Sequence, residues 1–576
     1  MQRASPAWWR DAVVYQVYPR SFADSDGDGI GDLAGLRGRL DHLSDLGVDV
    51  VWLSPVYPSP QDDAGYDISD YTDVDPVFGS LEELDRLLDA VHARGMRLVM
   101  DLVVNHTSDE HPWFVESRSG RDSSRRDWYW WRPPRSGAEP GTPGAEPNNW
   151  RANSSGSAWE FDPDSREYYL HLFSSKQPDL NWENPEVRQA VHAMMRWWLD
   201  RGVDGFRMDV INFISKPPAL LDAALRPGEV YADGFEHYAS GPRIHEFLQE
   251  MHREVFAGRD PAPLTVGEMP GVTVDDARLF TDPARGEVDM VFQFEHVRLD
   301  VGVDKWDVRG LDLRDLKACL GRWQAGLADV GWNSLYWQNH DQPRVVSRFG
   351  DDGDHRVESA KMLATVLHLH RGTPYVYQGE EIGMANAPFA SIDDFRDIES
   401  LNHHAHTVGA GLAREEDVLA ALRAQSRDNA RTPMQWDATP SAGFTTGTPW
   451  IAVNPDHTQV NVAAQRDDPD SVLAHYRRLV RLRHEEPVVV EGDFTMLLPD
   501  DPRVYAFTRR LGDVELLVLG NVSGTTAPAP VPGAAAWAAC EVLVGRVGAP
   551  GTDAEPLVLA PWEGRVYRRT GPGGAA

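Results

Sequence analysis

Short apolar runs recur along the first two thirds of the chain, and each ends at a polar or turn residue. Helical patterns lie between several of them, as in residues 81–94 and 187–201. Strands that alternate with helices predict parallel pairing, and eight such runs predict an α/β fold of the (β/α)8 TIM-barrel type. The eight runs are residues 13–18, 50–53, 98–101, 205–209, 264–268, 290–294, 333–337 and 374–377.

Two long interruptions break this alternation. Residues 105–179 contain a Pro/Gly-rich patch and many tryptophans, which is too much hydrophobic material for a disordered loop. We therefore predict an inserted small domain, the B domain, after strand 3. Residues 379–462 are polar and predicted to be irregular, and the histidines there (His403, His404 and His406) are interpreted as a solvated loop, not a metal site.

After residue 487 the pattern changes to short alternating stretches separated by turn residues, such as 504–509 and 514–519. This period of two is typical of antiparallel sheets. The predicted organisation is a catalytic barrel in residues 1–104 and 180–487, the B domain in 105–179 and a C-terminal antiparallel β-sandwich domain in 488–576.

Composition narrows the function. The chain has 576 residues, 41% of them hydrophobic, and a formal net charge of −33. That charge argues against nucleic acid or an anionic membrane as partner and favours a neutral small molecule. The N-terminus has no signal-like segment and no long apolar run occurs, so we expect a soluble cytoplasmic protein, a monomer or small homo-oligomer. Cys319 and Cys540 lie too far apart in sequence to indicate a disulfide framework or a zinc site.

Three acidic residues, Asp209, Glu268 and Asp341, each follow or close a predicted strand. Parallel barrels carry their catalytic side chains at this end of the strands. Retaining cleavage of a glycosidic bond needs a carboxylate nucleophile and a carboxylic acid. The sequence therefore predicts a glycosidase.

Neighbouring residues suggest how these acids divide the chemistry. Arg207 precedes Asp209 by two residues on the same strand, so both side chains point to the same side. Its positive charge would favour ionised Asp209, which selects Asp209 as nucleophile. Glu268 has no such cation nearby in sequence and is predicted to be the general acid. Asp341, beside His340, would bind sugar hydroxyls and help to distort the ring.

Further residues are expected at the same end of the barrel. His106 lies just beyond the third strand, and Tyr66 and Asp67 follow the second. Phe173, in the B domain, could stack on a sugar face. The acidic loop 24–32, after the first strand, has oxygen donors at alternate positions, as a hard cation requires. Calcium is the first candidate and magnesium the second; no organic cofactor is expected.

Together these motifs resemble the α-amylase superfamily, glycoside hydrolase family 13, and within it the oligo-1,6-glucosidase and α-glucosidase branch. The matching segments are 15–22, 101–106, 177–181, 205–209, 267–268, 339–341 and 431–436. The resemblance implies Asp209 as nucleophile, Glu268 as acid/base and Asp341 as transition-state stabiliser. It implies that the terminal glucose is held by Asp67, His106, Arg207, His340 and Arg427, and that the metal is held by Asp24, Asp26, Asp28, the Ile30 carbonyl and Asp32.

The resemblance also leaves alternatives open. Val210 looks like the α-1,6-preferring members, whereas α-1,4-preferring relatives tend to carry Thr or Ala there. Sucrose isomerases of the family carry an Arg-Leu-Asp-Arg loop, but here residues 298–300 are followed by Val301. Transglycosylation stays open because a sugar can attack a glucosyl-enzyme as water does. Non-catalytic transporter subunits of the family would need a membrane anchor.

Overall fold

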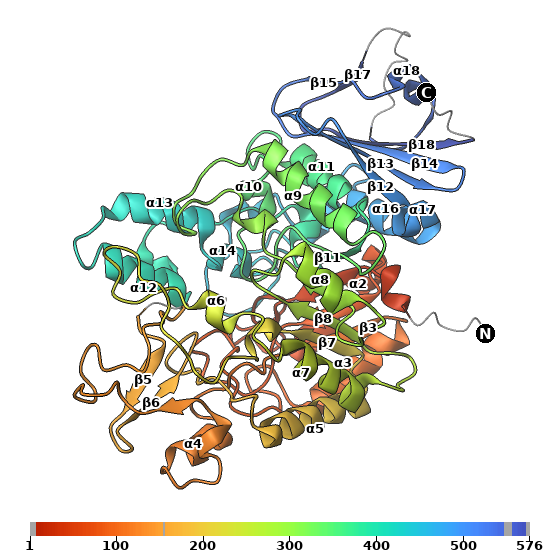
Figure 1. The fold of residues 1–576 in the computed structure, drawn as a ribbon. Coiled ribbons are helices and arrows are strands. Elements are labelled where there is room, and N and C mark those ends of the chain that lie inside the picture. The colour runs from red at the N-terminus through yellow and green to blue at the C-terminus, as the bar shows by residue number, and fades with distance from the viewer. Residues whose placement is uncertain (1–6, 154–155, 546–555, 572–576) are drawn as a thin grey trace.

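Eight parallel strands form the centre of the computed structural model, which describes residues 7–153, 156–545 and 556–571. The strand order is β10-β11-β1-β2-β3-β7-β8-β9, and an isolated parallel bridge between Val291 and Asn333 joins its two ends. The predicted (β/α)8 barrel is therefore confirmed (Figure 1). The strands are β1 Val14–Val17, β2 Val50–Leu53, β3 Arg97–Leu102, β7 Gly205–Met208, β8 Leu264–Glu268, β9 Met290–Phe292, β10 Ser334–Leu335 and β11 Thr373–Tyr377.

Several strands are shorter than their apolar runs suggested, β9 and β10 at their carboxyl ends. β9 ends at Phe292 and β10 covers only Ser334 and Leu335. Asp341 therefore follows its strand by six residues and lies in a turn, not at the strand end. The apolar residues that follow β10, such as Tyr336 and Trp337, are buried by packing without continuing the ladder.

Helices surround the barrel, and several bury one apolar face, whereas α11 is buried on nearly all sides between the barrel and the C-terminal sheet. In α3, the Ser80 side chain accepts a hydrogen bond from the amide of Glu83 and starts the helix, while the leucines expected on one face are buried. In α5, Pro185 follows the capping residue Asn184, and Gly202 ends the helix in a left-handed conformation. The surrounding helices are α1 Leu33–Gly38, α2 Leu40–Leu46, α3 Leu81–Ala93, α5 Pro185–Arg201, α6 Phe235–Tyr238, α7 Ile244–Met251, α8 Val274–Thr281, α9 Leu313–Gly326, α10 Val345–Arg348, α11 Arg356–His368, α16 Val472–Glu485 and α17 Pro487–Glu491.

The segment after β3 leaves the barrel and forms a small core together with residues from the connection after β7. It contains α4 Pro112–Arg118 and a three-stranded sheet of β4 Trp131–Arg132, β6 Glu167–Leu170 and β5 Trp159–Asp162, in that order. Trp130, Trp150 and Trp159 are buried there. The sheet lies at the lower left in Figure 1, at the opposite side of the molecule from the C-terminal strands.

The segment 379–462 is more regular than its polar sequence suggested. It contains α12 Ile398–Thr407, α13 Glu415–Gln425 and α14 Asp428–Arg431, and α15 Val462–Gln465 follows. The prediction that His403, His404 and His406 lie in a loop is wrong, because all three lie on α12. His403 stacks on Trp306, with ring centroids 4.7 Å apart. Packing against other parts of the chain stabilises this helix, and the sequence pattern alone did not reveal that packing.

Antiparallel strands form the C-terminal part of the chain, as predicted. A five-stranded sheet in the order β12-β13-β14-β18-β16 and a two-stranded sheet of β15 and β17 share one apolar core. α18 Ala534–Ala538 packs beside them (Figure 1). The strands are β12 Asp493–Leu497, β13 Val504–Leu511, β14 Val514–Asn521, β15 Ala527–Ala529, β16 Glu541–Val544, β17 Leu557–Leu559 and β18 Gly564–Thr570. The domain boundaries given above stay a prediction.

Among the described residues, no helix is both long enough and apolar enough to cross a lipid bilayer.

Candidate active site

A cavity of about 570 Å³ opens among the loops that follow the barrel strands. Seven of the residues expected from the sequence line it: Tyr66, His106, Phe173, Asp209, Glu268, Asp341 and Arg427. They come from five strand-to-helix connections, from the segment inserted after β3 and from the segment after β11. The barrel therefore brings together side chains that are hundreds of residues apart in sequence.

Arg207 lies at the centre of the charges beneath this cavity. Its Nη1 donates to Asp101 Oδ1 and to Asp209 Oδ1, both at 2.8 Å, and its Nη2 lies 2.5 Å from Glu268 Oε1. All four side chains are buried or nearly so. The prediction that Arg207 distinguishes Asp209 from Glu268 is therefore wrong, because one guanidinium bridges both carboxylates.

The protonation of this cluster follows from its charge count. Burial raises the pKa of the Asp209 carboxyl, and the attraction of Arg207 opposes that rise only in part because Glu268 and Asp101 repel a further negative charge. Burial likewise raises the pKa of Asp101 to about 6. Three buried carboxylates that share one cation favour retaining a proton among them.

Asp341 has the opposite environment. Arg431 Nη2 donates to its Oδ1 at 2.8 Å, and Arg427 Nη1 approaches the same oxygen at 3.5 Å. Burial alone would raise the pKa of Asp341, but His340, Arg427 and Arg431 outweigh it and hold that pKa well below its usual range. Asp341 is thus ionised at neutral pH, whereas the cluster around Arg207 is poised to hold a proton.

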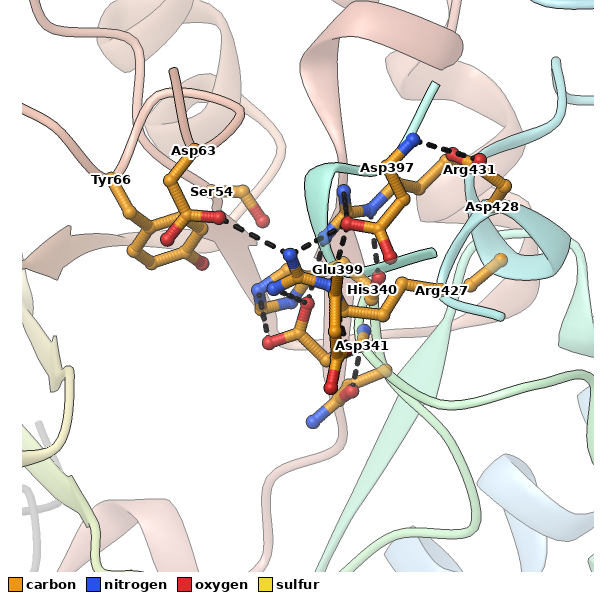
Figure 2. Close-up of polar contacts among 12 residues, drawn as sticks. Ser54, Asp63, Tyr66, His340, Asp341, Asp397, Glu399, Arg427, Asp428 and Arg431 are labelled. Carbon is orange, nitrogen blue, oxygen red and sulfur yellow. Dashed lines mark hydrogen bonds and ion pairs between the residues drawn. The ribbon is translucent and has the colours of Figure 1, made fainter. Parts of the chain in front are cut away.

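Arg427 closes one end of the cavity. Its Nη2 lies 3.3 Å from Asp63 Oδ1 and 2.6 Å from Asp397 Oδ1, and its Nε lies 3.6 Å from Glu399 Oε2. Figure 2 shows its guanidinium between Asp63 on one side and Asp341, Asp397 and Glu399 on the other. The side chains of Arg427 and Asp63 are only 17% and 16% exposed, so this end is nearly sealed.

Asp63 lies at the cavity wall, where the sequence analysis had placed Asp67. The Asp67 carboxylate is fully buried and accepts hydrogen bonds from Ser59 Oγ and from the amides of Asp62 and Asp63. Asp67 therefore forms the turn that carries Asp63 and does not face the cavity. The sequence shows an acidic turn that contains Gly65, but the side chain that points inward depends on the positive φ of Ala64 and Gly65, which the structure reveals.

Aromatic rings and histidines form the wall beside Asp63. His106 packs against Phe173 with ring centroids 5.1 Å apart, and its Nε2 lies 3.2 Å from both the Tyr66 carbonyl oxygen and Gln177 Nε2. His340 stacks nearly parallel on Tyr66, with centroids 5.2 Å apart. Tyr66 and His106 line the cavity, whereas His340 and Arg207 are buried outside its lining and support the wall from behind.

Val210, directly after Asp209, has an uncommon backbone conformation. Its φ of 36° and ψ of 41° lie in the left-handed region, which β-branched residues rarely adopt. In this conformation its amide donates to Glu268 Oε2 at 3.2 Å, and its side chain lines the cavity. Strain of this kind is typical of functional sites.

Lys216 is a residue that the sequence reasoning missed. Its fully buried Nζ lies 2.9 Å from Asp179 Oδ2 and donates to Asn105 Oδ1 at 2.9 Å and to the Phe213 carbonyl at 2.6 Å. Asp179 in turn accepts from the amide of Leu172. This one ammonium group therefore ties the segment inserted after β3 to the loops after β3 and β7.

The acidic loop after β1 brings carboxylates together as its spacing predicted. One oxygen each from Asp24, Asp26 and Asp28 lies within 4.8 Å of the others. An all-oxygen donor set of this kind fits a hard cation such as Ca²⁺. Asp32 lies apart from this group, where it accepts from Ser25 and caps α1 through the amide of Gly35.

Comparison with known proteins places these observations in context. The family model described as alpha amylase, catalytic domain, matches residues 16–492. An oligo-1,6-glucosidase from Parageobacillus thermoglucosidasius is 55% identical over 565 residues, which cover 97% of this chain and 99% of that protein.

Solved structures are equally similar in fold. The trehalose-6-phosphate hydrolase of Bacillus licheniformis superposes with a TM-score of 0.91 at 44% identity, covering 98% of this chain and 100% of that one. The isomaltulose synthase of Erwinia rhapontici does so with a TM-score of 0.92 at 42% identity, covering 98% and 100%. These relatives therefore span the whole chain, not the barrel alone.

We expect Lys216→Met to destabilise the fold strongly, because it leaves the buried Asp179 carboxylate without its cation. Loss of one partner of a buried pair costs about 3–5 kcal/mol of unfolding free energy. Denaturant unfolding followed by tryptophan fluorescence measures this loss. The matched control is Lys176→Met, since Lys176 is 39% exposed and lies 3.7 Å from Asp109; it should cost less than about 1 kcal/mol. Equal losses of unfolding free energy in the two variants would contradict a stabilising role of the Lys216–Asp179 pair.

Proposed function

From the premise that this chain belongs to the alpha-amylase family and is a glycoside hydrolase, we propose that it is a retaining, exo-acting α-glucosidase. It releases glucose from the non-reducing end of short α-glucosides and prefers α-1,6 linkages such as those of isomaltose and panose. The observation that carries this proposal is the bridging of Asp209 and Glu268 by the single guanidinium of Arg207, at the floor of a cavity with one nearly closed end.

The bridge favours the short separation of two carboxyl groups, about 5 Å, that retaining glycosidases need, over the roughly 6.5–9.5 Å of inverting ones. Asp209 attacks the anomeric carbon and forms a glucosyl-enzyme, while Glu268 gives its proton to the leaving oxygen. Glu268 then takes a proton from the water that releases glucose.

Asp341 and the two arginines beside it act on the sugar itself. The transition state carries positive charge on the ring, so an ionised carboxylate beside it lowers the barrier. Arg427 and Arg431 keep Asp341 ionised. Sugar hydroxyls at this end would exchange hydrogen bonds with Asp63, His106 and Arg427, which line the cavity.

Exo action follows from the closed end. Because Arg427 and Asp63 meet across the cavity, a chain cannot extend beyond the terminal glucose there. The leaving sugar must lie towards the open side. One glucose is then released in each catalytic cycle, and transglucosylation occurs when a sugar replaces water as acceptor.

Val210 supports the preference for α-1,6 linkages, because its side chain lies beside the nucleophile and lines the cavity. The relatives named oligo-1,6-glucosidase support it as well. Similarity to isomaltulose synthase keeps sucrose isomerisation as an outcome to be tested. Val301, where the isomerase loop has an arginine, favours hydrolysis.

We also propose that the loop 24–32 holds a structural Ca²⁺, with Mg²⁺ as the alternative. Asp24, Asp26 and Asp28 would supply carboxylate oxygens and Ile30 its carbonyl, whereas the Asp32 carboxylate, expected from the resemblance to be a ligand, caps α1 instead. The ion would brace the start of α1 and takes no part in catalysis. A cytoplasmic location and a monomer or small homo-oligomer stay predictions from the sequence.

We expect Asp209→Ala and Glu268→Gln each to lower kcat/KM for isomaltose by at least about 10⁴-fold, since each removes a group that acts in the transition state. Steady-state kinetics measures this, and circular dichroism checks folding. The first-formed glucose from α-glucosyl fluoride, whose leaving group is not a sugar, should be the α-anomer when observed by NMR. A β-anomer, or near-normal activity in either variant, would refute the mechanism.

We expect the wild-type enzyme to hydrolyse isomaltose and panose faster than maltose, and to yield no isomaltulose from sucrose. Val210→Thr should lower the isomaltose-to-maltose ratio of kcat/KM by roughly tenfold, because a single group in a pocket discriminates on that scale. Product analysis on isomaltose, panose, maltose, sucrose and trehalose measures both. A higher rate on maltose would refute the linkage preference while leaving the α-glucosidase assignment intact.

We expect a strong chelator to lower the melting temperature by roughly 2–5 °C, because an ion that binds only the folded state stabilises it. Added Ca²⁺ should reverse the change. In Asp26→Asn, which loses one ligand, the chelator should have little further effect. An identical chelator response in the wild-type protein and this variant would count against the site.

A further inference from the structure

A buried ion pair connects the cavity wall to the barrel on the side away from Asp63. Arg348 Nε lies 2.6 Å from Asp300 Oδ2, and its Nη2 donates to Asp300 Oδ1 at 2.7 Å. The two side chains are only 3% and 4% exposed. Two parallel bonds of this kind fix orientation as well as distance, and the mechanism proposed above does not use either residue.

The same guanidinium binds two further segments. Its Nη2 donates to the Val297 carbonyl at 2.6 Å, and its Nη1 donates to Gln342 Oε1 at 2.7 Å, one residue after Asp341. Gln425, two residues before Arg427, donates to Asp300 Oδ2 at 3.3 Å. Arg348 and Asp300 thus connect the loop after β9 to the segments that carry Asp341 and Arg427.

Asp300 also forms the base of a hairpin. Its carbonyl accepts from the amide of Arg309 at 2.7 Å, and Val301 and Val308 pair as an antiparallel bridge. Residues 301–305 of this hairpin line the cavity. The carbonyl of Asp300 closes the hairpin, and its carboxylate fixes the hairpin to the barrel through Arg348.

The hairpin lies at the open side of the cavity. Val303, at its tip, is 84% exposed, whereas Asp63 and Arg427 at the other end are less than one fifth exposed. If the terminal glucose occupies the closed end, the leaving sugar must extend towards Val303. A buried ion pair therefore fixes the base of the wall that meets this sugar. Farther along the hairpin, Lys305 pairs with Glu399 and Trp306 stacks on His403.

We propose that Arg348 is a positioning residue that holds the 300–309 hairpin as the wall of the leaving-group subsite through its pair with Asp300. This inference rests on the proposed α-glucosidase function and deepens it. Arg348 lies in the cavity lining, but its guanidinium is engaged by Asp300, the Val297 carbonyl and Gln342. It determines how well a leaving sugar is bound and aligned, and not whether the anomeric carbon can react.

The test compares two substrates that share the glucosyl group. Isomaltose places a second sugar against the hairpin, whereas α-glucosyl fluoride has a leaving group too small to reach it. In Arg348→Lys, which keeps the charge but loses the fork, kcat/KM for isomaltose should fall at least about tenfold, mainly through KM, because small misplacements have large effects on a positioned reactant. The value for glucosyl fluoride should stay within about threefold.

The matched control is Arg188→Lys, another buried arginine that pairs with a carboxylate, Glu250, and with carbonyl oxygens, but outside the cavity lining. Both substrates should respond alike there. If Arg348→Lys does not fold, Asp300→Asn serves instead, since it keeps the shape and should show the same selective loss.

An equal fall for both substrates, or an unchanged rate on isomaltose, would overturn the positioning role while the α-glucosidase assignment stands. A wild-type protein that hydrolyses neither substrate would instead refute the proposed function, and this inference with it.

Discussion

The placement of Arg207 in the barrel floor is the constraint on which the rest of the site depends. A buried guanidinium needs negative partners, and Asp101, Asp209 and Glu268 supply them from three neighbouring strands. Because three acids share one cation, their proton affinities are linked. The arrangement therefore fixes the positions of the Asp209 and Glu268 carboxylates and makes their protonation interdependent.

A second cluster of charged side chains, around Asp341, lies on loops, whereas the cluster around Arg207 lies on or next to strands. Asp341 is held between Arg427 and Arg431, and Asp397 binds Arg427 from behind. These residues follow β10 and β11 by long connections, so their positions depend on packing of α12 to α14 and not on the barrel ladder (Figure 2). A rigid floor with an adjustable upper wall is what a barrel needs to vary its substrate without changing its chemistry.

The strands that carry the cluster around Arg207 were predicted more accurately from the sequence than the loops that form the cavity wall. Strands buried on both faces give continuous apolar runs, so β2 and β8 were predicted to the residue. The predicted length of β10 was wrong, because Tyr336 and Trp337 are buried by tertiary packing and form no hydrogen bonds of the sheet. Asp63 and Asp67 differ only in the direction of their side chains within one turn, which depends on the backbone conformation at Ala64 and Gly65. Lys216 gave no local signal, since its partners Asp179 and Asn105 lie far away in sequence.

Val210 contacts Glu268 at the floor of the site and also lines the cavity. Its left-handed backbone directs the amide to Glu268, and the same conformation directs the side chain into the cavity. The strain of that conformation costs about 1–3 kcal/mol, which the buried surroundings must offset. A change at this position would therefore alter both the hydrogen bond to Glu268 and the lining of the cavity.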